Sequence, residues 1–171
     1  MPQSPVRIMF VCSGNICRSP LAHRVLEHHA ARRDMATAVA VESSGVGAWH
    51  VGEDADPRMR ETAGRHGVRL HHEVRQLRDR DIRDYDLLFA MDRGHYRDIR
   101  RRAGGRDLDG VLHLFRDFDP QAQPEADGLA PDVPDPYYGG RDGFELVYQI
   151  VERTSNAILD AIAAGKLGRS A

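Results

Sequence analysis

Cysteine is scarce in this 171-residue chain, and that scarcity limits what the sequence can encode. The two cysteines, Cys12 and Cys17, lie in one short stretch, so no partner elsewhere could build a disulfide framework. Such usage suits a reducing compartment. Long hydrophobic runs are also missing, and the N-terminal residues have a short apolar run without a small-residue cleavage site. We therefore expect a cytoplasmic protein that does not enter a membrane.

An excess of positive charge is missing as well. The formal net charge is −2, which gives no electrostatic basis for general binding to nucleic acid. The nine histidines include the adjacent pairs His28-His29 and His71-His72, which do not share a helix face, and no spacing resembles a zinc motif. The basic run from Arg97 to Arg106 is typical of a solvated helix end. We expect no nucleic-acid partner, no metal and no cofactor.

Strand-like and helix-like segments alternate along the chain, whose length fits a single domain over residues 1–171. Short apolar segments predict strands at residues 6–11, 38–41, 87–91 and 111–115. Amphipathic segments predict helices at residues 20–33, 56–67, 92–102 and 144–165. Residues 117–138 hold five prolines and no apolar periodicity, which indicates a long loop. This order predicts an α/β fold, a parallel sheet with helices on both faces.

The stretch from Val11 to Pro20 carries the chemistry. It follows a buried strand and opens a helix, so its backbone N–H groups and the helix dipole favour a bound anion. Gly14 and Asn15 are residue types that tolerate the positive φ of a tightly closed loop. Cys12 would be ionised and nucleophilic beside a helix N-terminus and a cation, and Arg18 can grip two oxygens of an oxyanion at once. An inert core thiol is the alternative for Cys12.

Residues 12–20 resemble the phosphate-binding loop of the low-molecular-weight protein tyrosine phosphatases. The segment Asp135-Pro136-Tyr137-Tyr138 resembles the general-acid segment of that family, and the resemblance extends from residue 6 to about residue 164. It implies a three-layer, four-stranded parallel sheet of flavodoxin-like phosphatase fold. It also implies hydrolysis of phosphotyrosine through a phosphocysteine at Cys12. The loop residues expected to bind phosphate are Ser13, Gly14, Asn15, Ile16, Cys17 and Arg18.

A proton donor is needed for the leaving oxygen, because a thiolate cannot supply one. Asp135 lies on the proline-rich loop, which could bring it over the anion site. As general acid it would protonate the leaving group and then, ionised, activate water. An aspartate before proline is by itself most often a turn residue. The resemblance favours the catalytic role.

The resemblance assigns supporting roles to further residues. Trp49 and Tyr137 would wall a deep cleft that fits a flat phosphotyrosine ring and leaves phosphoserine too short. His50 would lie at its rim, and Tyr138 would be a further residue of the substrate cleft. Ser19 would donate a hydrogen bond to the Cys12 sulfur. Ser43 and His72 would fix the strained Asn15. Asp92 would shape the site or only cap a helix. Cys17 would trap oxidised Cys12 as a reversible disulfide, with a small loop residue without chemistry as the alternative. Two departures from the family pattern are a longer stretch between Pro120 and Asp135 and a histidine, His95, where asparagine is common.

Two other functions are compatible with an anion-binding loop. An arsenate reductase shares this fold and loop, but it needs downstream cysteines, and none follows Cys17, so an external thiol would be required. A binding module without turnover would recognise phosphorylated partners, although binding alone needs neither Cys12 nor Asp135. A phosphatase acting as a monomer on a phosphotyrosine-containing protein, such as a bacterial tyrosine kinase, is the favoured interpretation.

Overall fold

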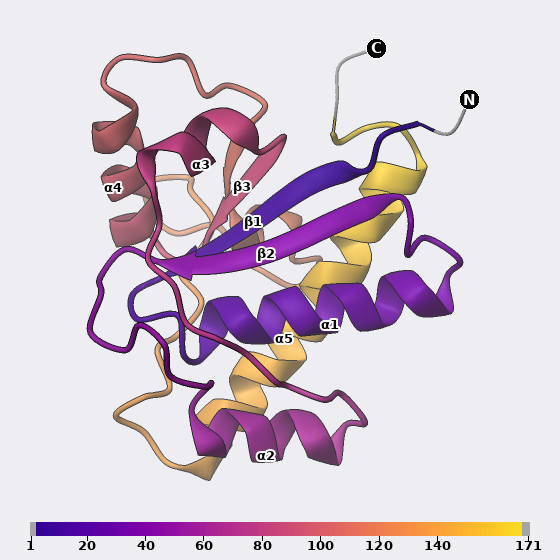
Figure 1. Ribbon diagram of the computed structural model, residues 1–171, viewed down its shortest axis with the longest axis vertical. Helices are drawn as coiled ribbons and strands as arrows, with labels where there is room; N and C mark the ends of the chain where they lie inside the picture. Colours follow the sequence, from indigo (N-terminus) through magenta and orange to yellow (C-terminus); the bar gives the residue numbers. More distant parts are fainter. Residues whose placement is uncertain (1–2, 169–171) are drawn as a thin grey trace.

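A computed structural model of the chain describes residues 3–168 and contains a four-stranded parallel sheet (Figure 1). The strands are β1 (Val6–Cys12), β2 (Val39–Gly45), β3 (Leu87–Ala90) and β4 (Leu112–Leu114), in the order β2-β1-β3-β4. All three pairings are parallel. Because β1 lies between two neighbours and its residues 8–12 are buried, its carboxyl end opens at the middle of the sheet. That is where α/β folds of this kind bind ligands.

Helices cover both faces of the sheet, as predicted (Figure 1). One face carries α1 (Arg18–Arg32), α2 (Pro57–Arg65) and α5 (Arg141–Ala163), and the other carries α3 (Asp79–Asp84) and α4 (Arg93–Ala103). The alternation of side chains along β1 divides the core. Ile8 and Phe10 belong to the cluster under α1 and α5, whereas Met9 and Val11 belong to the cluster under α3 and α4.

The predicted strands and helices are present, with differences at their ends. Helix α1 begins at Arg18 and not at Pro20, and β2 continues to Gly45 beyond the predicted residue 41. Phe115, predicted to end the fourth strand, begins a 3₁₀ helix, Phe115–Phe118. Helix α3 was not predicted, because Ile82 is the one apolar residue among its six and no periodicity can be read from it.

The long proline-rich connection contains no helix or strand from residue 119 to residue 140. It leaves the sheet after β4 and returns to the carboxyl ends of the strands before α5 begins, since the backbone N–H of Val133 donates to the carbonyl of Met91 at 2.9 Å. This contact brings the predicted general-acid segment to the edge of the sheet where β1 ends. Among the described residues, none of the helices has the length and apolarity that a membrane crossing requires.

Candidate active site

The loop between β1 and α1 begins with the thiol of Cys12, which is 3 % exposed. Its Sγ lies 2.9 Å from Oγ of Ser19, which is itself fully buried. Helix α1 begins directly after Cys17 in the chain. It has no side-chain cap and no acidic residue in its first turn. The first N–H groups of α1 therefore have no side-chain acceptor at the cap and carry the positive end of the helix dipole toward the loop. This arrangement is favourable for binding an anion.

Asn15 holds the loop in shape through a fully used side chain. Its φ is +59°, in the left-handed region, so the conformation needs support from its surroundings. Its Nδ2 donates to Oγ of Ser19 at 2.8 Å and of Ser43 at 3.1 Å. Its Oδ1 accepts from Nε2 of His72 at 2.7 Å and from the backbone N–H of Arg75 at 3.1 Å. The two predicted partners, Ser43 and His72, are both present. The contact with Ser19 was not predicted, and the backbone N–H of Arg75 has no sequence signal.

Gly14 and Gly45 are needed because other parts of the protein lie close to them, and not because they adopt a positive φ. Gly14 does not adopt a positive φ, contrary to expectation. A Cβ at Gly14 would lie 3.1 Å from Cδ2 of His50. A Cβ at Gly45 would lie 2.7 Å from the carbonyl oxygen of Ser13, a backbone atom that cannot move aside alone. Gly45 therefore lets the loop pack on the end of β2, a role that sequence analysis missed although the Ser-Ser-Gly end of the strand was visible.

Arg18 is held in one orientation by groups from three segments. Its guanidinium is buried, and Nη1 donates to Oδ2 of Asp92 and to the carbonyl of Val133, both at 3.0 Å. Its Nη2 lies 3.5 Å from Oγ of Ser13 and 3.5 Å from Oδ2 of Asp135. Burial raises the pKa of Asp92, but His95 and Arg18 outweigh it and hold that pKa below its ordinary value. Asp92 is both the N-cap of α4 and an anchor for Arg18, so its two expected roles coexist.

His95 occupies the position next to Ser13 inside the protein. Its Nε2 lies 2.8 Å from Oγ of Ser13, and its ring is 3 % exposed. Its Nδ1 lies 3.2 Å from Oδ1 of Asp92 without forming a hydrogen bond, and the same Oδ1 accepts from the backbone N–H of His95 at 3.0 Å. Burial lowers the pKa of His95 to about 4, so the ring is neutral near pH 7.

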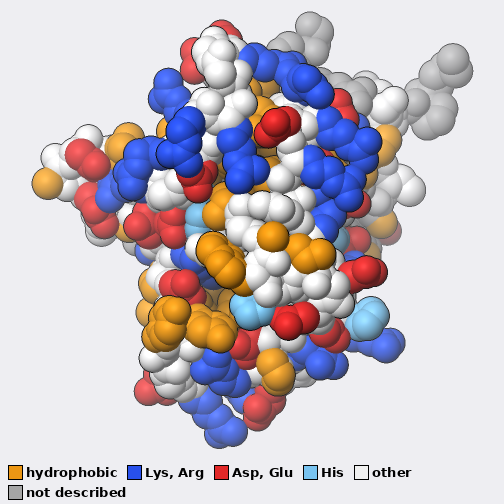
Figure 2. Space-filling view, turned by 60° about the vertical axis from the view of Figure 1, so that its left-hand side comes forward, with side chains coloured by type: hydrophobic (Ala, Val, Ile, Leu, Met, Phe, Trp, Pro, Cys, Tyr) orange, Lys and Arg blue, Asp and Glu red, His pale blue; other side chains and the backbone are white. Residues whose placement is uncertain are grey.

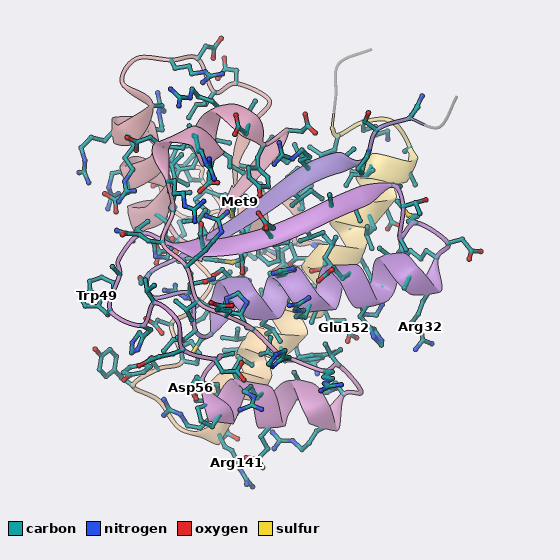
Figure 3. The ribbon with its side chains drawn as sticks, viewed as in Figure 1. Met9, Arg32, Trp49, Asp56, Arg141 and Glu152 are labelled. Atoms are coloured by element: carbon teal, nitrogen blue, oxygen red, sulfur yellow. The ribbon has the colours of Figure 1, made fainter. Side chains whose placement is uncertain are left out.

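A cleft of about 440 Å³ opens above Cys12. Its walls beyond the loop are Trp49, His50, Asp135, Tyr137 and Tyr138. Figure 3 shows Trp49 extending outward from the segment that follows β2, and 71 % of this side chain is exposed. Tyr137 is 37 % exposed, whereas Tyr138 is 91 % exposed and contributes only to the mouth. Figure 2 shows hydrophobic side chains grouped on the face that carries α4, below a part rich in Lys and Arg.

Cys17 is buried at the end of the loop, where it lines the cleft together with Cys12, and both cysteines are free thiols. Burial raises the pKa of the Cys17 thiol, and the nearby carboxylate of Asp56 raises it further. Figure 3 shows Asp56 at the start of α2, where it caps the helix by accepting from the backbone N–H of Arg58. Cys17 is therefore a protonated thiol at neutral pH and is not a second nucleophile of the resting site.

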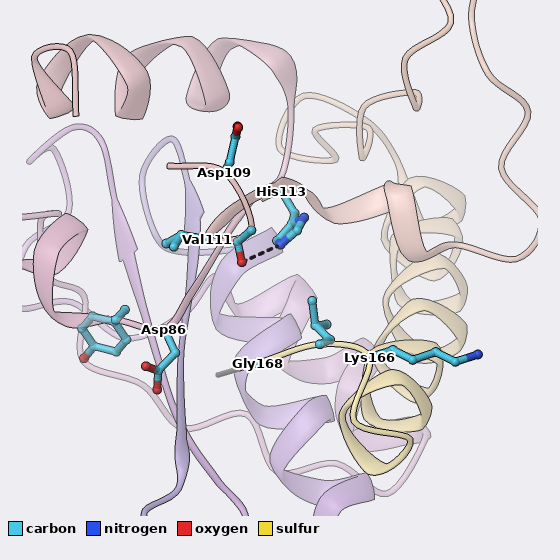
Figure 4. Close-up of a pocket in the computed structure, with 9 residues that line it drawn as sticks. Asp86, Asp109, Val111, His113, Lys166 and Gly168 are labelled. Atoms are coloured by element: carbon cyan, nitrogen blue, oxygen red, sulfur yellow. Dashed lines mark hydrogen bonds between the residues drawn. The ribbon is translucent and has the colours of Figure 1, made fainter. Parts of the chain in front are cut away.

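A larger cavity of about 560 Å³ lies at the amino ends of β3 and β4, away from the loop (Figure 4). Its lining mixes acidic and basic side chains, including Asp109, His113 and Lys166, and contains no cysteine or serine. His113 uses its Nε2 on the carbonyl of Gly110 at 3.3 Å. Within residues 3–168 no group of three or more Cys, His, Asp or Glu side chains is suited to hold a metal ion. The cleft above Cys12 is the site with a nucleophile.

The two buried histidines of the site make stability depend on pH. Burial lowers the pKa of both His72 and His95 to about 4, against 6.5 for the unfolded chain. Between pH 4 and pH 6.5 the unfolded chain binds more protons than the folded protein. The stability that the neutral histidines contribute is therefore fully present above pH 6.5, and the free energy of unfolding falls as the pH drops toward 4. The steepest fall is about 1.4 kcal/mol per pH unit for each histidine.

Urea unfolding between pH 7 and 4.5 measures this slope, with His95→Gln beside the wild type. Glutamine can still reach Ser13 but does not titrate, so the variant is expected to lose one histidine's share of the slope. The difference between the two proteins removes the contributions of His29 and His113, whose pKa values burial also lowers. Equal slopes in both proteins would show that His95 is not buried in its neutral form.

A thiol at the floor of an anion-binding loop, a fixed arginine and a carboxylate facing it define a cysteine-dependent phosphatase of α/β fold. Comparison with known proteins makes this specific. Residues 7–167 match the family described as low molecular weight phosphotyrosine protein phosphatase. The chain belongs to that family.

Relatives from distant organisms cover nearly the whole chain. A low molecular weight protein-tyrosine-phosphatase of Streptomyces coelicolor is 41 % identical over 96 % of this chain and 98 % of its own length. The low molecular weight phosphotyrosine protein phosphatase of Sus scrofa is 33 % identical over 91 % of this chain and 94 % of its own. A crystal structure of a protein tyrosine phosphatase from Entamoeba histolytica, with Hepes in its active site, superposes with a TM-score of 0.87 at 30 % identity. That match covers 95 % of this chain and 99 % of the other.

Proposed function

We propose that this protein tyrosine phosphatase hydrolyses phosphotyrosine in two steps, through a phosphocysteine at Cys12. One observation supports the proposal above the others. The Cys12 Sγ lies at the floor of the cleft, 2.9 Å from the Ser19 hydroxyl, while Arg18 and Asp135 face the same cavity. A nucleophile, an anion-binding group and a proton donor therefore share one cleft of about 440 Å³, large enough to hold a phosphorylated ring.

In the first step the loop binds the phosphate dianion. The N–H groups at the start of α1 and the guanidinium of Arg18 surround its oxygens, and Nη2 exchanges its long contact with Asp135 for the phosphate. The Cys12 thiolate attacks phosphorus and forms the S–P bond as the P–O bond to the tyrosine breaks. The carboxylic acid of Asp135 gives its proton to the departing phenolate oxygen, so tyrosine leaves neutral.

In the second step water replaces the tyrosine. The carboxylate of Asp135 takes one proton from water as its oxygen attacks phosphorus, and the S–P bond breaks to return the thiolate and free phosphate. Ser19 is arranged to assist this departure. Its oxygen accepts from Nδ2 of Asn15, so its hydroxyl proton is free for the Cys12 sulfur at 2.9 Å, in preference to the carbonyl of Ser44 at 3.4 Å. A hydrogen bond to sulfur lowers the basicity of the leaving thiolate.

The aromatic walls provide the preference for tyrosine. Tyr137 lies beside Asp135, and its ring is packed between Arg58 at 5.4 Å and His50 at 6.5 Å, both measured to the ring centre. A flat ring can stack between Tyr137 and Trp49 while its phosphate reaches Cys12. We infer that the partner is a phosphotyrosine-containing protein, with a bacterial tyrosine kinase as a candidate. We also infer that the enzyme is a cytoplasmic monomer, and the two free thiols are consistent with a reducing compartment.

The test is phosphate release from two peptides that differ only in phosphotyrosine or phosphoserine, measured with chelator and reductant present. We expect release from the phosphotyrosine peptide, with kcat/KM larger by about two orders of magnitude or more, because phosphoserine cannot span the cleft. Equal release from both peptides would leave the proposed chemistry of the loop intact and would refute the role of the aromatic walls in the preference for tyrosine. No release from either would favour a phosphate-binding module, and arsenate turnover with added thiol would then favour a reductase.

A further inference from the structure

The segment that carries the general acid is long and has few attachments to the protein. Residues 119–140 form no helix or strand, and Leu129 at its middle is half exposed. Within residues 3–168, every hydrogen bond and ion pair that joins residues 123–131 to the rest of the protein involves one residue, Arg93. The position of this part of the segment therefore depends on a single side chain.

Arg93 reaches three points of the segment with one guanidinium. Nη1 donates to Oε2 of Glu125 at 2.5 Å, and Nη2 donates to Oδ1 of Asp127 at 2.9 Å and to the carbonyl of Leu129 at 3.4 Å. Its backbone N–H, the first of α4, donates to Oδ1 of Asp132 at 2.9 Å. A carboxylate at a helix N-terminus is favourably placed, so backbone and side chain hold the same segment.

Arg93 also lies next to the catalytic groups in the chain. It follows Asp92, which holds Arg18 at 3.0 Å. In the segment that Arg93 contacts, Asp132 directly precedes Val133. The carbonyl of Val133 accepts from Arg18 at 3.0 Å, and Asp135 follows Val133 by two residues. The Asp132 carbonyl receives a further hydrogen bond from Arg116 at 3.1 Å. The guanidinium of Arg93 thus fixes the part of the segment that directly precedes Val133 and Asp135, the two residues that contact Arg18.

We propose that Arg93 is the positioning residue of the general-acid segment, setting where Asp135 stands over the cleft. The inference rests on the proposed function, in which Asp135 donates the proton. Arg93 does not touch the cleft itself, since it is absent from its lining. It acts by restricting the segment, so its loss lets Asp135 spend less time within reach of the leaving oxygen.

This role has a signature that a merely structural role lacks, because a general acid matters most for a poor leaving group. Arg93→Gln is expected to lower kcat/KM for phenyl phosphate about 5- to 20-fold, and that for p-nitrophenyl phosphate less than about 2-fold. In an Asp135→Asn background the same change is expected to have no further effect within about 2-fold, since both changes act on one proton transfer. Glu125→Gln combined with Asp127→Asn keeps Arg93 and is expected to reproduce the selective loss.

Arg97 supplies the matched control. It is an exposed arginine one turn further along α4, and within the described residues it has no ion pair or hydrogen bond to a side chain. Arg97→Gln is expected to leave both rates unchanged, which separates the effect of Arg93 from a loss of positive charge.

Four results would overturn the proposal. Equal losses of Arg93→Gln for the two substrates, or a further loss in the Asp135→Asn background, would mean that Arg93 acts through Asp92 and Arg18. If Asp135→Asn lowers kcat/KM selectively for phenyl phosphate and Arg93→Gln leaves kcat/KM for both substrates unchanged, only the role of Arg93 is refuted. An Asp135→Asn variant without any leaving-group response would refute the proposed acid and, with it, the positioning role.

Discussion

Cys12→Ser is expected to bring phosphate release from phosphotyrosine below detection, a loss of at least about 10⁴-fold in kcat. The serine oxygen can occupy the site of the sulfur beside Ser19, but it is not ionised near neutral pH and has no base to take its proton. His72 and His95 are bonded to Asn15 and Ser13 and are not placed to activate residue 12. His50, which lines the cleft, uses its Nδ1 on Glu53. The expected variant is therefore folded and inactive.

The same variant is expected to keep its affinity for inorganic phosphate or to gain some. Arg18 and the start of α1 remain in place, and a neutral hydroxyl removes the repulsion between a thiolate and a dianion. Titration calorimetry with phosphate measures the affinity, and the thermal midpoint with and without phosphate checks that the fold is kept.

Cys17→Ser is the matched control for the thiol chemistry. Cys17 lies in the same loop, is equally buried, and its thiol has a raised pKa. Its loss is expected to change kcat only a few-fold through altered packing. Comparable inactivation by both substitutions would mean that loop packing, and not the nucleophile, had been lost, and residual turnover by Cys12→Ser would refute the phosphocysteine.

The sequence was sufficient for the parts of the structure that follow from local periodicity and from short motifs. Strand β1 is an apolar run interrupted only by Arg7, and Asp56 followed by Pro57 marks the start of α2 as its N-cap and first residue. Helix α3 lacks such a pattern, and its Asp81 forms a partly buried ion pair with Arg75 at 2.9 Å. Ion pairs of this kind join residues whose proximity no hydrophobic period encodes.

The residues of the site also fall into those that the sequence could predict and those that it could not. Asn15 in a left-handed turn could be expected from its residue type, and its partners Ser43 and His72 from the family resemblance. Gly45 and the backbone N–H of Arg75 could not, since their roles come from how closely the end of β2 and the segment before α3 approach the loop. A backbone N–H does not depend on the residue type that carries it, and a glycine does not by itself indicate which atom it lies against.

His95 illustrates a residue that the sequence singled out without an explanation. In the structure its ring bonds Ser13 from the first turn of α4, so it joins the helix that anchors Arg18 to the loop that binds phosphate. The ring is neutral at pH 7, which lets it sit beside Arg18 without adding a second positive charge. An asparagine at this position would supply a similar neutral hydrogen bond from a shorter side chain.

Asp135→Asn is expected to lower kcat/KM for a phosphotyrosine peptide by about 10²- to 10⁴-fold, the usual contribution of a general acid. The geometry makes this change selective. Oδ1 of Asp135 accepts from the backbone N–H of Tyr137 at 3.1 Å, and the amide oxygen of asparagine can accept the same hydrogen bond. The turn is therefore kept, while the group that faces Arg18 at 3.5 Å no longer carries a transferable proton.

Aryl phosphates of graded leaving-group pKa measure this effect. The loss is expected to be small for p-nitrophenol, which departs as an anion without help, and to grow toward phenol, so a plot of log kcat/KM against leaving-group pKa becomes steeper than for the wild type. Asp142→Asn, an exposed aspartate in the first turn of α5, is the matched control and is expected to leave the slope unchanged. An equal loss across the series would instead mean that Asp135 acts on binding through its contact with Arg18, because only a proton donor distinguishes among leaving groups.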